Sequence, residues 1–154
     1  MELRTRLSTA LKEAMKAKEA DRLSTLRLIN AAIKDREIAQ RGAAEGDATG
    51  VTDEDLLVIL SRMVKQRQES ARAYEEGGRL ELAEKEQTEI KVIEEFLPKQ
   101  LDEQETEAAV KAAIAETGAD SIRDMGRVMG VLKAKYTGQM DFGRVGPMVK
   151  NQLG

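Results

Sequence analysis

Residues 52–78 read TDEDLLVILSRMVKQRQESARAYEEGG, and the fold class follows from this segment. Thr52 suits a helix N-cap, and Asp55 stands at the third helical position, which is the spacing of a capping box. Apolar residues then recur at helical spacing, at Leu56, Leu57, Ile59, Leu60, Met63 and Val64. Gly77 and Gly78 interrupt the pattern. The segment therefore predicts a long helix whose first half is apolar and whose second half is polar.

Helical spacing continues on both sides of this segment. In the first helix the expected apolar stripe consists of Leu3, Leu7, Leu11 and Met15. We expect six further helices, over about residues 2–18, 21–41, 80–97, 102–117, 124–137 and 142–153. A loop of small residues is expected at 42–51, after a stop at Gly42. Pro147 falls inside the last pattern, so that helix either begins near Pro147 or is kinked.

The composition agrees with an all-α fold of two parts. The 154 residues include only two prolines and four aromatic residues, so the core must be aliphatic. Strong helix formers such as Ala, Leu, Glu and Lys dominate. Pro98 disfavours helical geometry in the residue before it, and it is the predicted boundary. We expect an N-terminal domain of four helices at 1–97 and a smaller C-terminal domain of three helices at 98–154.

Several kinds of chemistry are excluded by the residues that the chain lacks. Without cysteine there is no disulfide, thiolate nucleophile or zinc–thiolate site. Without histidine there is no Ser-His-Asp arrangement, and di-iron sites of helical bundles require a Glu-x-x-His. No phosphate loop, apolar membrane span or signal peptide is present. We therefore expect no catalytic residues, metal or cofactor, and a cytoplasmic location.

Basic residues are concentrated near the end of the chain. The net charge is −3 overall, but residues 119–154 hold six basic and three acidic residues. The predicted helices there place their aliphatic side inward, which leaves five cations for solvent: Arg127, Lys133, Lys135, Arg144 and Lys150. Such a cluster could neutralise a few phosphates. An ordinary solvated surface is the alternative interpretation.

Gly126 and Gly130 lie four residues apart in the predicted helix 124–137, and therefore on one face. Glycine inside a helix costs about 1 kcal/mol relative to alanine, so two of them suggest that another group approaches closely. That group is either a neighbouring helix or an RNA backbone, and the sequence leaves both open.

Several segments, in order along the chain, resemble the YqeY proteins. They are LRLINAAIK at 26–34, QRQES at 66–70, EEFLPKQL at 94–101, MGRVMG at 125–130 and GQMD at 138–141. The resemblance covers essentially the whole chain. It implies that the part after Pro98 is similar to the helical tail domain of the B subunit of the bacterial aspartyl/glutamyl-tRNA amidotransferase, which contacts tRNA.

The resemblance thus implies a tRNA-associated binding module without the catalytic part of that enzyme. The label of a carbon–nitrogen ligase with glutamine as amido donor comes with the relationship, and no residue of this chain supports it. The residues expected to contact RNA are Gly126, Arg127, Gly130, Lys133, Lys135, Arg144 and Lys150. The alternatives are a protein-interaction adapter without RNA binding, and an enzyme that depends on a partner's catalytic subunit.

Overall fold

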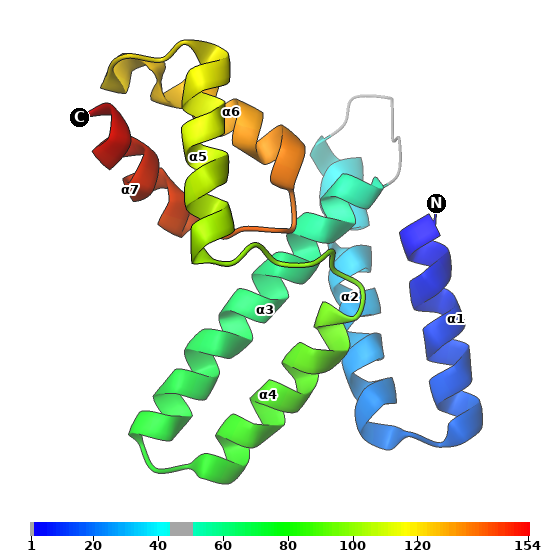
Figure 1. The fold of residues 1–154 in the computed structure, drawn as a ribbon. Helices are drawn as coiled ribbons and strands as arrows, with labels where there is room; N and C mark the ends of the chain where they lie inside the picture. Colours follow the sequence, from blue (N-terminus) through cyan, green and yellow to red (C-terminus); the bar gives the residue numbers. More distant parts are fainter. Residues whose placement is uncertain (1, 44–50) are drawn as a thin grey trace. The chain divides into compact units, whose positions relative to one another are not determined.

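The computed structural model describes residues 2–43 and 51–154, and these residues form helices and no strand (Figure 1). The helices are α1 (Glu2–Ala17), α2 (Ala20–Ala43), α3 (Asp53–Glu76), α4 (Leu80–Glu94), α5 (Glu103–Thr117), the 3₁₀ helix η1 (Ile122–Asp124), α6 (Met125–Tyr136) and α7 (Phe142–Leu153). The all-helical class expected from the sequence is confirmed. The chain divides into two compact units, Met1–Leu97 and Pro98–Gly154.

Two helical hairpins make up the first unit. Figure 1 shows α1 and α2 running antiparallel, as do α3 and α4. Helix α2 contacts each of the other three helices. The aliphatic core that joins the hairpins includes Leu26, Ile29, Leu56, Leu60 and Ile93, each at most 2% exposed. Burial of each such side chain contributes about 1.5–3 kcal/mol, so the core is the main source of stability of this unit.

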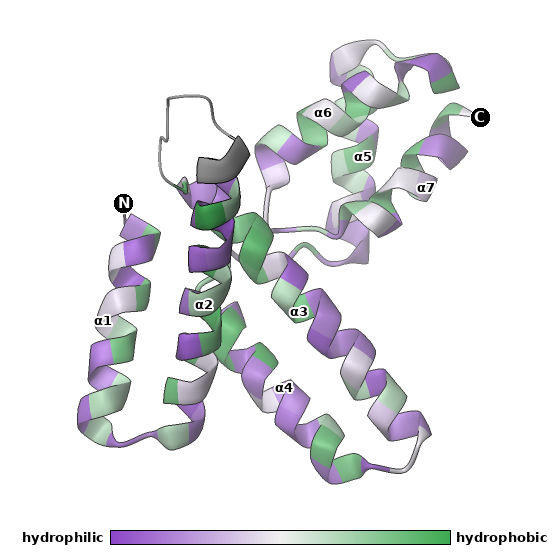
Figure 2. Ribbon diagram, turned by 180° about the vertical axis from the view of Figure 1, so that it is seen from behind, coloured by the Kyte–Doolittle hydropathy of each residue, from purple (hydrophilic) through white to green (hydrophobic). Residues whose placement is uncertain are grey.

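Helix α3 has the N-terminus and the polarity that the sequence predicts. The Thr52 hydroxyl accepts a hydrogen bond from the Asp55 backbone N–H, and the Asp55 carboxylate accepts one from the Thr52 N–H. Figure 2 shows α3 hydrophobic near α2 and mostly hydrophilic toward the turn to α4. That turn contains Gly78 at φ 74°, a backbone conformation that glycine adopts without steric cost.

Three expectations for the first unit require correction. Met15 is 53% exposed, and Ala10 and Ala14 are buried in its place. Residues four apart rotate by about 40° per step around a helix, so a strict four-residue stripe turns away from the core. Helix α4 ends at Glu94, earlier than expected, and hydrogen-bonded turns connect it to Pro98. Helix α2 continues through Gly42, and residues 44–50 of the expected loop lie outside the described residues.

Helices α5, α6 and α7 of the second unit pack around a separate core. Asp102 and Glu105 form a capping box at the start of α5, and Gly118 ends it in the left-handed conformation, both as expected. The buried side chains of this core are Ala109, Val110, Ala113, Val128, Leu132, Met140, Val145 and Val149. The segment before α5 belongs to the same unit, because the Leu101 N–H donates to the Gln139 carbonyl at 2.9 Å.

Pro147 lies inside α7, which begins at Phe142 with Asp141 as its N-cap. The alternative that this helix begins near Pro147 is therefore wrong. A residue before proline normally avoids helical geometry because its Cβ and N–H clash with the proline ring. Gly146 has no Cβ, which removes one of these clashes, whereas the backbone hydrogen bond that Pro147 cannot donate is still lost.

Candidate nucleic-acid interface

The packing of α6 decides which of its residues face outward. Val128 and Leu132 are fully buried, and Met125 and Met129 pack against the same core at the edges. The helix begins directly after η1 and ends at Tyr136, which is also part of the apolar side. The opposite side of α6 therefore faces away from the core of the second unit.

Gly126 and Gly130 lie on this outward side, and both are exposed. A Cβ atom built on either glycine would meet no atom within 4 Å among the described residues. Within the second unit, therefore, no neighbouring helix approaches closely enough to require the two glycines. Lys133 follows Gly130 by three residues, so it lies on the same face, and its side chain forms no ion pair within the described part of the chain.

Arg127 borders the glycine face but already has an anionic partner. Its Nη2 lies 2.6 Å from Oδ1 of Asp124, and the exposed fractions of the two side chains are 61% and 20%. The second carboxylate oxygen, Oδ2, accepts the backbone N–H of Asp120 at 3.2 Å. The hydrogen bond from Arg127, followed by that from Asp120, lowers the pKa of Asp124 below its ordinary value, so the carboxylate is charged at neutral pH.

Lys135 lies on the other flank of α6, toward α5. Its Nζ is 2.7 Å from Oε2 of Glu116 on α5, and both side chains are about half exposed. This hydrogen bond raises the pKa of Lys135. Lys135 is about 140° around the helix from Gly130, so it does not belong to the glycine face. Lys135 therefore lies on a different side of α6 from Gly126, Gly130 and Lys133.

Arg144 and Lys150 are exposed on α7, on either side of its buried Val145 and Val149. Neither side chain forms an ion pair in the part of the chain that the structure describes. They are six residues apart and therefore turned by about 120° from each other around the helix axis. The predicted contact residues thus come from two helices and from different sides of each helix. Those that share a face are Gly126, Gly130 and Lys133, with Arg127 beside them.

Two residues of this region were missed by sequence reasoning. Arg123 is exposed in η1, three residues before Gly126, and the cluster of cations could have included it on spacing alone. Asp124 could have been found as the partner of Arg127 because residues three apart meet on a helix surface. The pair between Glu116 and Lys135 is different, because it depends on the packing of α5 against α6.

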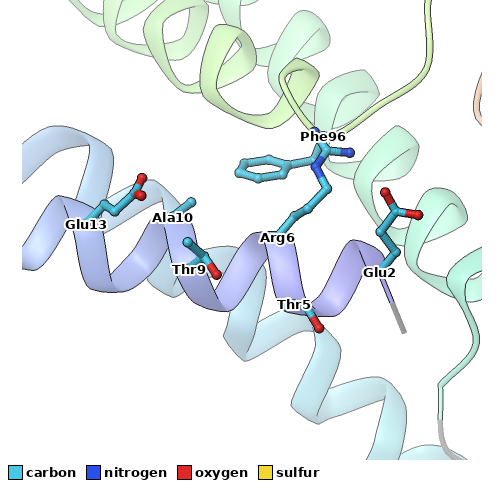
Figure 3. Close-up of a pocket in the computed structure, with 7 residues that line it drawn as sticks. All are labelled: Glu2, Thr5, Arg6, Thr9, Ala10, Glu13 and Phe96. Carbon is cyan, nitrogen blue, oxygen red and sulfur yellow. The ribbon is translucent and has the colours of Figure 1, made fainter.

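A shallow hollow of about 480 Å³ lies on α1 in the first unit (Figure 3). It is lined by Glu2, Thr5, Arg6, Thr9, Ala10, Glu13 and Phe96. Figure 3 shows the Arg6 side chain reaching Phe96, with its guanidinium carbon 5.6 Å from the ring centroid. Arg6 also donates to the Glu95 carbonyl at 3.0 Å. Its cation therefore has internal partners, and the hollow presents no unoccupied charged group suited to an anion.

Among residues 2–43 and 51–154, no three carboxylate side chains come together as a metal site would require. None of the helices that these residues form combines the length and apolar character of a membrane span. The candidate site is the glycine face of α6, where Gly126 and Gly130 are exposed and Lys133 lies on the same side.

Curated relatives match part of the chain. An uncharacterized protein of Schizosaccharomyces pombe is 31% identical over 88 residues, which are 57% of this chain and 66% of that protein. A protein of Clavispora lusitaniae named "Altered inheritance of mitochondria protein 41, mitochondrial" is 36% identical over 91 residues, 59% of this chain and 49% of the relative. Its namesake in Eremothecium gossypii is 35% identical over 91 residues, 59% of this chain and 46% of the relative. The matches therefore span about half to two thirds of these relatives.

The comparisons correct one expectation and confirm another. The cytoplasmic location expected from the sequence is overturned, because several matched relatives are named as mitochondrial proteins. The resemblance to the YqeY proteins is confirmed, since the model of the family described as "Yqey-like protein" matches residues 4–153. This chain belongs to the Yqey-like protein family.

Proposed function

We propose that this chain is a non-catalytic, tRNA-associated binding module whose residues 98–154 contact RNA phosphates. The observation that carries the proposal is the outward face of α6, where Gly126 and Gly130 leave open space and Lys133 projects beside them. Glycines on a helix surface let another backbone approach closely, and an adjacent cation favours one that is negatively charged. We further propose that 1–97 and 98–154 are separate folding domains.

The proposed recognition relies on shape and phosphates and not on stacked bases. Base stacking needs exposed aromatic side chains. The aromatic residues in the second unit, Tyr136 and Phe142, are half-buried and pack against its core. The assignment to tRNA in particular comes from the resemblance of residues 98–154 to the amidotransferase tail domain, and it carries no amide-transfer chemistry with it.

The ion pairs of α6 limit the expected strength of binding. Arg127 and Lys135 are paired with carboxylates, whereas Lys133, Arg144 and Lys150 form no ion pair within the described chain. Each phosphate contact contributes a slope of about −0.7 to −0.9 to the dependence of log affinity on log salt. We therefore expect weak binding that depends on two or three contacts and decreases as salt rises.

Filter retention of tRNA at low and physiological salt tests the proposal. The wild-type chain is compared with Lys133→Gln on α6 and with Lys85→Gln on α4, which removes the same charge from an exposed position in the first unit. The proposal predicts retention at low salt, weaker retention for K133Q, and wild-type retention for K85Q. If the wild-type chain retains no tRNA even at low salt, the proposal is wrong.

A protein-interaction adapter is the second candidate, and exposed apolar residues on α2 favour it. Leu28 is 42% exposed and Ile38 is 65% exposed. Leu28, Ala31 and Ile38 follow the spacing of one helix face, and all three are exposed. Affinity purification with and without ribonuclease separates the two candidates. Partners that stay bound after ribonuclease treatment and are lost in Leu28→Ser favour the adapter.

A further inference from the structure

The ion pair beside the glycine face joins an exposed arginine to a carboxylate that has a second hydrogen-bond donor. Asp124 is held at two points, because Oδ2 accepts the Asp120 backbone N–H and Oδ1 accepts Arg127. Its side chain is 20% exposed, whereas that of Arg127 is 61% exposed. The long Arg127 side chain can leave the carboxylate by changing rotamers, and Asp124 then keeps the hydrogen bond from the Asp120 N–H.

We infer that Asp124 competes with an RNA phosphate for Arg127. Arg127 exchanges the Asp124 carboxylate for the phosphate when RNA occupies the glycine face. This inference rests on the proposed function. In the free chain the pair contributes almost no net charge to the face. An approaching phosphate meets Asp124 as a like charge and must displace it from the guanidinium. Asp124 therefore weakens binding and also reduces its dependence on salt.

The second ion pair of α6 supplies a matched control. Lys135 and Glu116 lie at a similar separation, 2.7 Å compared with 2.6 Å, and both cations are more than half exposed. The two pairs differ in position, because Lys135 faces α5 and Arg127 borders Gly130. Neutralising either acid raises the net charge of the chain by one. Only the neutralisation of Asp124 releases a cation next to the glycine face.

The experiment measures the affinity of the full chain for tRNA over a range of salt concentrations. The variants are Asp124→Asn, Glu116→Gln, Arg127→Gln and the double variant of Asp124→Asn with Arg127→Gln. The asparagine amide oxygen can still accept the Asp120 N–H, so D124N keeps the loop anchored, and circular dichroism melting checks that each variant is folded. The inference predicts that D124N binds tRNA about three- to fivefold more tightly than wild type at low salt. This factor corresponds to the free energy that an exposed ion pair contributes.

Under the inference, D124N also steepens the dependence of log affinity on log salt by about one phosphate contact. E116Q changes neither the tRNA affinity nor this slope. The effect of D124N disappears when Arg127 is also replaced. The inference is overturned if D124N binds like wild type, if E116Q gives an equal gain, or if the gain persists without Arg127. Binding by D124N where the wild type shows none supports the inference, although the wild-type chain then fails the proposed function. Absence of binding by every variant overturns both.

Discussion

The Thr52 hydroxyl accepts the Asp55 N–H at 3.1 Å, and the Asp55 carboxylate accepts the Thr52 N–H at 3.0 Å. The same carboxylate accepts a hydrogen bond from Gln40 on α2 at 3.3 Å. Asp55 thus both begins α3 and connects it to the first hairpin. The Thr52 backbone hydrogen bond is the main cause that lowers the pKa of Asp55.

We predict that Asp55→Ala lowers the free energy of unfolding by about 1–2 kcal/mol at neutral pH, as for the loss of a helix cap. Because the folded pKa is lowered, the carboxylate stabilises the fold above its unfolded pKa of about 4, and this contribution is lost as the pH falls through the folded pKa. Urea unfolding at pH 7 and pH 3 measures both effects. Glu54→Ala, in the same helical turn but outside the capping box, is the control. A loss that is equal at both pH values would contradict the account.

A second prediction concerns the ion pair between α3 and α4. Arg67 and Glu89 are 3.3 Å apart, and their side chains are only 15% and 17% exposed. Arg67 also donates to the Met63 carbonyl. A double-mutant cycle with Arg67→Ala and Glu89→Ala should give a coupling of about 1–2 kcal/mol, between the values for exposed and buried pairs.

The exposed pair between Lys111 and Glu107 on α5 is the control for this cycle. Its side chains are 61% and 51% exposed, so its coupling should stay near about 0.3–0.5 kcal/mol. Equal coupling energies for the two pairs would show that burial between α3 and α4 does not strengthen the first.

A third prediction tests whether the two units fold separately. Leu132 is fully buried in the second core, and Leu60 is 1% exposed in the first. Leu132→Ala should cost about 2–5 kcal/mol. Hydrogen exchange should then accelerate in residues 98–154 and stay at the wild-type rate in 1–97, with the opposite pattern for Leu60→Ala. Faster exchange throughout the chain in either variant would indicate one cooperative unit.

The sequence predicted helix ends well where local hydrogen bonds define them. Asp102 with Glu105, Gly118 and the Thr52 capping box act within a few residues, so their spacing was sufficient. The end of α4 was predicted too late, because Phe96 packs into the core of the first unit beyond the last helical residue, Glu94. Burial after a helix end depends on the tertiary fold and leaves no periodic pattern.

At the candidate site, the sequence predicted which residues share one face of α6. It did not show whether another helix packs against that face. Helical spacing alone puts Gly126, Gly130 and Lys133 together. Only the structure shows that no other helix of the second unit packs against the two glycines. They also pair Lys135 with Glu116, a contact that requires α5 and α6 to be packed together.

If the open face of α6 admits an RNA backbone, side chains added there should hinder binding, and the double variant Gly126→Ala with Gly130→Ala adds them. Both positions are helical and a Cβ meets no described atom nearby, so the substitutions should stabilise the fold, by about 1 kcal/mol at Gly130 in the helix interior and by less at Gly126 in the first turn. Thermal melting and tRNA affinity are measured on the same samples at the same salt. The account predicts a higher melting temperature with an affinity reduced by about tenfold, or about 1.4 kcal/mol. A stabilised variant that binds tRNA as tightly as wild type would contradict it.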